Sequence, residues 1–269
     1  MAITTLDGAI AGFQIPKPIT KTGIATAAVG AMRGYTLWYA AGNPGAGAAP
    51  TAGINGVAVT GNAKQGQIPR TNPGAGNAYL GRLSINASTA GVMMLIDRLW
   101  ENSALSVTST AAQAIAAAAL PSRSGDGTTN GDQVMAAIEW SATGGAGVPT
   151  VTLTYTDSAG NAGNTGTFTA VASPPVGTFE IFNLAAGDTG IRAPSSFIQS
   201  ATRTSGTMHL VLFRILAQME VSAANIGNAI DVLTSGMPRL YDGTVPQLVW
   251  FPSVTTATQF TGTYIETHG

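Results

Sequence analysis

Residues 150–170 read TVTLTYTDSAGNAGNTGTFTA, and this stretch decides the fold class. In its first half Val151, Leu153 and Tyr155 alternate with threonines, a period of two that predicts a β-strand with one buried face and one threonine face. The segment 157–163 is rich in Gly, Asn, Asp and Ser, which accept the backbone conformations of tight turns. The alternation resumes after the turn, so the stretch predicts an antiparallel hairpin.

Further strands are predicted on both sides of this hairpin. Residues 208–216 are apolar at both parities apart from His209 and Arg214, which predicts a central strand. Residues 92–99 look similar, with Asp97 and Arg98 inside the run. The other predicted strands are 134–140, with one apolar face, 179–184 and 197–202. Seven or eight short strands predict a mainly β fold, an antiparallel β-sandwich of jelly-roll-like type, over residues 79–220.

The segment before this core has a different composition. Residues 1–78 are broken by prolines and Gly-rich loops, which prevents long regular elements, yet they are too apolar for a solvated linker. We therefore expect an extended N-terminal arm, with a short helix at 24–33, that docks on a neighbouring molecule. The alternative is that the arm packs back on its own sandwich.

The segment after the core, residues 221–269, is expected to hold one short C-terminal helix and a strand. Ser222 is a candidate N-cap for this helix, whose apolar face would comprise Ile226, Ile230 and Leu233. The strand is predicted at 245–251, where Pro246 favours an edge position or the strand start.

Charge is the most unusual feature of the composition. Only 9% of the residues are Asp, Glu, Lys or Arg, against roughly 25% in a typical soluble domain. Either a Thr/Ser/Asn skin or neighbouring molecules must replace the usual charged surface, and both favour an assembly component over a freely diffusing enzyme. The net charge of −1 and the scattered basic residues predict no nucleic-acid partner and no membrane contact.

Motifs that carry known chemistry are absent from the sequence. There is no cysteine, no P-loop, no G-x-S-x-G and no H-E-x-x-H. His209 is expected to be a packed histidine rather than a catalytic base, because its predicted strand is so apolar. Glu139 and Glu180 could form a glycosidase pair, but among 13 acidic residues some such proximity is expected by chance. Asp126 and Asp132 could hold a cation, but solvated side chains in a turn are the favoured interpretation. We expect no enzymatic activity, no cofactor and no metal.

Five short motifs occur in order along the rest of the chain. They are YTDSAGNAG (155–163), LAAGDTGIR (184–192), HLVLFRIL (209–216), NAID (228–231) and GMPR (236–239). Together they resemble a recurrent pattern of tailed-bacteriophage virion structural proteins over roughly residues 75–269, with departures at Asn164 and at 215–216. The resemblance implies a component of the phage particle and carries over no catalytic residue.

Within a particle, the expected role is a capsid decoration or cement protein on the outer surface of the phage head. It would be made in the host cytoplasm and contact the major capsid protein and copies of itself, most simply as a homotrimer. The alternatives are a tail or receptor-binding component that contacts carbohydrate, and a major capsid protein. The predicted interface residues are Phe13, Ile15, Leu37, Trp38, Tyr39, Trp250 and Phe251.

Overall fold

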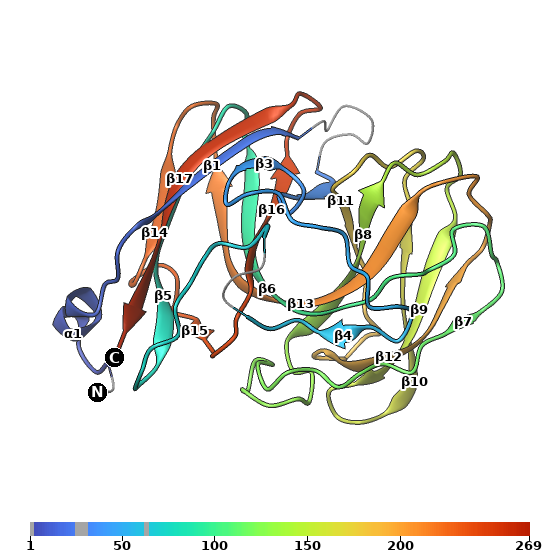
Figure 1. The fold of residues 1–269 in the computed structure, drawn as a ribbon, viewed down its shortest axis with the longest axis horizontal. Helices are drawn as coiled ribbons and strands as arrows, with labels where there is room; N and C mark the ends of the chain where they lie inside the picture. The colour runs from blue at the N-terminus through green and yellow to red at the C-terminus, as the bar shows by residue number, and fades with distance from the viewer. Residues whose placement is uncertain (1–2, 25–31, 62–64) are drawn as a thin grey trace.

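The structure is a computed structural model that describes residues 3–24, 32–61 and 65–269 (Figure 1). Seventeen strands and one short helix, α1 (Leu6–Ala11), are found in these residues, and all strand pairings are antiparallel. The predicted mainly β, antiparallel class is therefore confirmed. The finer prediction of a jelly-roll-like sandwich is not, because the central sheet is closed.

Six strands close into a barrel at the centre of the molecule. In hydrogen-bonding order they are β13 (Thr207–Val221), β8 (Val134–Ala142), β11 (Thr178–Ile181), β2 (Gly34–Thr36), β16 (Pro246–Pro252) and β6 (Gly91–Glu101). Pairing of β6 with β13 closes the ring, and the two-residue β4 (Val57–Ala58) is attached to β6. The ring joins distant parts of the chain, since Thr36 of β2 lies opposite Val249 of β16.

Two further sheets flank the barrel on opposite sides (Figure 1). The terminal sheet comprises β14 (Asn228–Asp231), β5 (Ala78–Ala87), β17 (Thr258–His268), β1 (Lys17–Ile24) and β3 (Ala41–Asn43), with β15 (Arg239–Leu240) also paired to β5. The hairpin sheet comprises β10 (Ala162–Thr169), β9 (Thr150–Asp157), β12 (Ile191–Gln199) and β7 (Gln113–Ala114). Separate apolar clusters join each sheet to the outside of the barrel wall.

A third apolar cluster fills part of the barrel interior and explains the most apolar strands. Val211 and Phe213 of β13 lie in this inner cluster, while Leu210 and Leu212 pack outward against the hairpin sheet. Burial on both faces is the reason for apolar residues at both parities, so the prediction of a central strand is confirmed. The single apolar face predicted for 134–140 is wrong, because Ala137 on the second face of β8 is also buried in the barrel.

The hairpin at 150–170 is confirmed. Strands β9 and β10 pair from Thr150↔Thr169 to Thr156↔Ala162. Val151, Leu153 and Tyr155 are all buried, as the alternation requires, and the threonines stand on the outer face. The strands predicted at 179–184 and 197–202 are found a few residues earlier, as β11 and β12.

The prediction of an extended N-terminal arm is wrong. The alternative is correct, because the described residues of 1–78 pack against the rest of the same chain. Strand β1 pairs with β17 and β3, and β2 is one of the six strands of the barrel. The prolines and glycines shorten these strands without excluding them, since each strand takes its hydrogen bonds from a distant partner. The helix predicted at 24–33 falls mainly on residues outside the described ranges.

The short C-terminal helix is also wrong. Residues Asn228–Asp231 form β14, which pairs with β5, and the side chains of Ile226 and Leu233 are 56% and 74% exposed. The apolar spacing of three and four residues is a coincidence here, because the free edge of β5 offers backbone partners and the Asp231 carboxylate accepts hydrogen bonds from the following turn. The strand predicted at 245–251 is confirmed as β16, with Pro246 at its start.

Candidate functional site

Half of the charged side chains in the described residues are inside the molecule. Six of the 11 Lys and Arg residues described and six of the 13 Asp and Glu residues are buried. They are Lys21, Arg70, Arg98, Arg123, Arg203 and Arg214, and Asp97, Glu101, Glu139, Asp157, Glu180 and Glu266. The surface is therefore even poorer in charge than the composition implies.

One group of these charges lies in the barrel interior. Arg98 Nη1 is 2.8 Å from Glu139 Oε2, and Arg98 Nε is 2.6 Å from Glu101 Oε2. Gln247 Nε2 and Tyr39 Oη donate hydrogen bonds of 3.0 Å each to the two oxygens of Glu139. The carboxylate of Glu139 is thus held by donors from two other barrel strands, β6 and β16, and by Tyr39, so it links these strands across the barrel interior.

His209 lies opposite Glu139 on the neighbouring strand and is a packed histidine, as predicted. Its Nε2 is 2.7 Å from Ser141 Oγ, and its Nδ1 is 3.1 Å from the carbonyl oxygen of Asn102. Burial lowers the pKa of this imidazole below its ordinary value of 6.5. The neutral ring is therefore the form that the folded protein favours.

This shift predicts that His209 makes the protein less stable in acid. Because the pKa is lower in the folded state, the unfolded state binds more protons as the pH falls below about 6.5, and stability is lost in that window. Relative to a His209→Gln variant, the wild type should lose up to about 1.4 kcal/mol per pH unit as the pH falls below 6.5. Urea titrations of both proteins at each pH measure this difference, and parallel pH profiles would contradict it.

The two carboxylates of the candidate glycosidase pair are on opposite sides of the barrel wall. Glu139 points inward, whereas Glu180 lies beside Ile138, whose side chain packs outward. Glu180 accepts hydrogen bonds from Trp140 Nε1 and from the backbone N–H of Val171. The two carboxylates therefore do not face each other as a glycosidase pair. Burial, rather than a neighbouring carboxylate, is the main cause that raises the pKa of Glu180.

Two of the motifs that carry the phage resemblance, 155–163 and 184–192, are hydrogen-bonded to each other. Tyr155 Oη donates to Asp188 Oδ2 and accepts from the backbone N–H of Ala185, so the hairpin motif holds the turn of the second motif. The backbone N–H of Ser158 donates to the carbonyl oxygen of Gly190 at 3.0 Å. These hydrogen bonds fix the crossing of two loops.

The Asp126/Asp132 loop is closed by its own hydrogen bonds. Asp126 Oδ1 accepts from the backbone N–H and the hydroxyl of Thr128, which lowers the pKa of the Asp126 carboxyl. Asn130 Oδ1 accepts from Arg192 at 2.7 Å. Across the described ranges, no three His, Cys, Asp or Glu side chains gather as metal ligands.

Most of the predicted interface residues take part in the chain's own packing. Leu37, Trp38 and Trp250 are at most 3% exposed, so their assignment to an interface is wrong. Phe13, Tyr39 and Phe251 are half-buried, and Phe251 packs against the cluster inside the barrel. Of the seven, Ile15 is the one with a freely exposed side chain, at 85%.

The outer face of the hairpin sheet is a regular array of threonines, as the alternation predicts. Cross-strand pairs place Thr165 beside Thr154, and Thr167 beside Thr152, on the face turned away from the core. Ile198 of β12 continues the second row. These rows carry hydroxyl and methyl groups and no charge, so the face can be covered without removing an ion from water.

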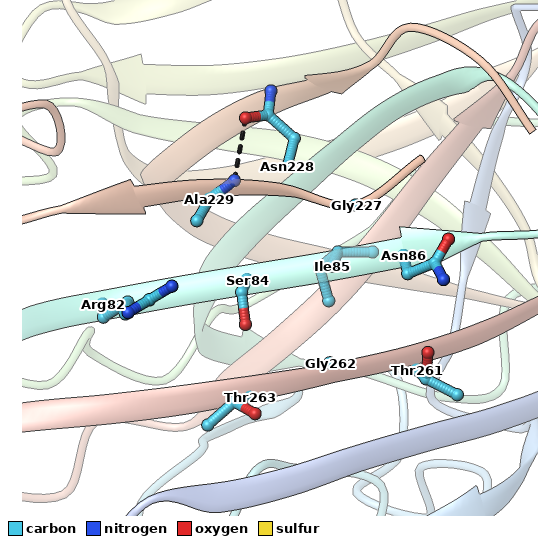
Figure 2. Close-up of a pocket in the computed structure, with 10 residues that line it drawn as sticks. All are labelled: Arg82, Ser84, Ile85, Asn86, Gly227, Asn228, Ala229, Thr261, Gly262 and Thr263. Carbon is cyan, nitrogen blue, oxygen red and sulfur yellow. Dashed lines mark hydrogen bonds between the residues drawn. The ribbon is translucent and has the colours of Figure 1, made fainter. Parts of the chain in front are cut away.

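The outer face of the terminal sheet is similar and contains a groove, which the sequence did not reveal. Thr20, Thr261 and Asn86 form one row across β1, β17 and β5. The groove has a volume of about 590 Å³ and lies between β14, β5 and β17, with Ser84 and Thr263 in its wall (Figure 2). The residues that line it are Arg82, Ser84, Ile85, Asn86, Gly227, Asn228, Ala229, Thr261, Gly262 and Thr263. Its polar groups come from segments more than 140 residues apart, so no local motif marks it.

Comparisons with known proteins found no match. No protein-family model matches it, no curated protein matches it, and no solved structure matches it. Within the described residues, no helix has the length and apolar character needed to cross a membrane. The threonine rows on the outer face of the hairpin sheet and the groove on the outer face of the terminal sheet are the candidate functional surfaces.

Proposed function

We propose that this chain is a non-enzymatic structural component of a tailed-phage particle, and specifically a decoration protein on the outer surface of the head. The observation that carries this proposal is the placement of charge. Half of the ionic groups are buried, and the outer face of the hairpin sheet presents rows of threonine. Such a face suits permanent contact better than free diffusion.

The physical argument concerns the cost of covering this face. Burying an ionised side chain at an interface costs several kcal/mol unless a partner compensates it. A threonine row offers methyl groups for packing and a hydroxyl that finds a backbone partner easily. The proposed contacts are with the major capsid protein and with copies of the chain itself, most simply as a homotrimer, because closed symmetry avoids open-ended association.

A second candidate, a tail component that contacts carbohydrate, is favoured by the groove of the terminal sheet. Its wall presents the hydroxyls of Ser84, Thr261 and Thr263 and the amide of Asn86 (Figure 2). Hydroxyls, amides and one guanidinium are groups that bind sugars through hydrogen bonds. Binding of oligosaccharides to the isolated protein, lost on replacement of these side chains, would favour this candidate.

The two candidates predict different copy numbers. A decoration protein should be present in hundreds of copies in purified particles that contain this chain, whereas a tail component should be present in a few dozen or fewer. Quantitative mass spectrometry against the major capsid protein measures this ratio. Absence of the chain from the particles would contradict both candidates.

The docking face can be tested in the same system. Thr167→Asp places a charge in a threonine row of the hairpin-sheet face, on the edge strand β10, and we expect it to weaken binding to undecorated heads about tenfold or more. Thr20→Asp, an exposed threonine in the terminal sheet, is the matched control and should bind normally. Binding of the wild type should change little between low and high salt. Equal binding of both variants to the heads, or release of the wild type by moderate salt, would contradict the assignment of the hairpin-sheet face as the docking face.

A further inference from the structure

One buried group of charges outside the barrel interior is not balanced. Asp97 accepts two hydrogen bonds from Arg123, from Nε to Oδ2 at 3.1 Å and from Nη2 to Oδ1 at 3.2 Å. Arg214 Nη2 lies 3.9 Å from the same carboxylate. Two guanidinium groups that are at most 5% exposed thus share one carboxylate.

The shared carboxylate has no capacity left for the second guanidinium. Its oxygens also accept from the hydroxyl of Thr244 at 3.2 Å and the backbone N–H of Val245 at 2.9 Å. Within the described part of the chain, Arg123 Nη1 and Arg214 Nε are buried and find no acceptor. A buried N–H without an acceptor costs about 1–3 kcal/mol, and more on a charged group. Together the two guanidinium groups have more buried N–H donors and more positive charge than Asp97 balances.

A third arginine extends this group to the surface. Arg214 and Arg239 both lie over the ring of Tyr241, with Cζ-to-centroid distances of 5.2 and 4.7 Å. Arg214 Nη2 donates to the backbone carbonyl of Arg239, and Arg239 Nη2 donates to Asn77 Oδ1. The side chain of Arg239 is exposed, and Asn77 is its one side-chain hydrogen-bond acceptor within the described ranges.

A pocket of about 340 Å³ opens at this point. Arg123, Arg239 and Tyr241 all line it, together with the hydroxyl-bearing Thr60 and Ser122. Asp242 also lines it and is exposed. Counting Asp97 and Asp242 against Arg123, Arg214 and Arg239 leaves one positive charge uncompensated. By contrast, the nearby Arg70 has a carboxylate partner, Glu266, to which its Nε is bound at 3.3 Å.

We propose that this pocket, named here the arginine pocket, binds an oxyanion of the phosphate class. Guanidinium groups match the oxygens of phosphate through paired N–H donors, and they do so with more geometric specificity than lysine. The exposed N–H groups of Arg239 supply direct contacts, and the anion compensates the positive charge of Arg123 and Arg214 behind it. This binding activity goes beyond the proposed role in a particle and is independent of it.

The test uses inorganic phosphate as the probe and the thermal unfolding midpoint as the measurement. A ligand that binds the folded state alone raises this midpoint with its concentration. We expect a saturable rise with phosphate that sodium chloride at equal ionic strength does not reproduce. Arg239→Gln should weaken the apparent affinity about tenfold or more, since it removes charge-assisted hydrogen bonds.

Two further variants keep the result interpretable. Arg239→Lys retains the charge and should retain weaker phosphate binding, while Arg82→Gln, at the exposed arginine of the terminal-sheet groove, should leave binding unchanged. The side chain of Arg239 is exposed, so folding of its variants is checked by their midpoints without phosphate. No rise beyond that with chloride, or an equal rise in Arg239→Gln, would overturn the proposal.

Discussion

Replacing Glu139 with glutamine is expected to lower the free energy of unfolding by about 3–5 kcal/mol. The substitution keeps the size of the side chain and removes its charge. Arg98 therefore loses its ion pair with residue 139 inside the barrel, where Nη1 is 2.8 Å from the carboxylate. An amide keeps only one acceptor oxygen and turns an N–H₂ group toward the other donor, so either Gln247 or Tyr39 loses its acceptor on this side chain. Urea unfolding at pH 7 measures the loss.

Glu220→Gln is the matched control. It lies on β13, a strand of the same barrel, and its side chain is exposed, so the same chemical change should alter stability by no more than about 0.5 kcal/mol. Joint replacement of Arg98 and Glu139 by leucine should cost less than the sum of the two single changes, because the charges are removed together. Equal costs for the Glu139 and Glu220 variants would contradict the buried network.

Gly190→Ala is expected to cost at least about 3 kcal/mol, at the upper end for an overpacked site. A Cβ at this position would stand 2.0 Å from the carbonyl oxygen of Gly131 and 2.8 Å from the backbone nitrogen of Val134. Both neighbours are backbone atoms, so no side chain can move to relieve the contact. The loop crossing that carries the phage-like motif would have to open.

Gly187 in the same motif provides the comparison. Its φ is +94°, which a Cβ disfavours, but open space surrounds the position. Gly187→Ala should therefore cost only about 1–2 kcal/mol, the penalty of the left-handed conformation. Denaturant unfolding of the two variants separates a conformational cost from a steric one, and a larger loss in Gly187→Ala would contradict the tight crossing.

Elements with a local signal could be predicted from the sequence. The hairpin at 150–170 is determined by alternation and by turn residues within one short stretch. The buried strand at 208–216 is apolar at both parities because it has neighbours on both faces. Both signals depend only on residues next to each other in the chain, and both predictions hold.

Elements that depend on partners far away in the sequence could not be predicted from the sequence. Nothing near residues 34–36 indicates that they pair with 246–252, and the apparent helix at 222–236 contains a strand because β5 offers an edge. The interior charges were missed for a related reason, since hydropathy treats charge as a mark of the surface. Asp97 and Arg98 inside an otherwise apolar run were the signal that could have found them.

The closure of the barrel has a consequence for synthesis of the protein on the ribosome. The strand at 34–36 pairs with the strand at 246–252, so about 210 further residues must be synthesised before the barrel can close. At 5–20 residues per second this takes roughly 10–40 s. During that time the early strands expose apolar surface and unpaired edges, which are targets for aggregation. The nascent chain therefore depends on delayed collapse or on chaperone cover until its last strands emerge.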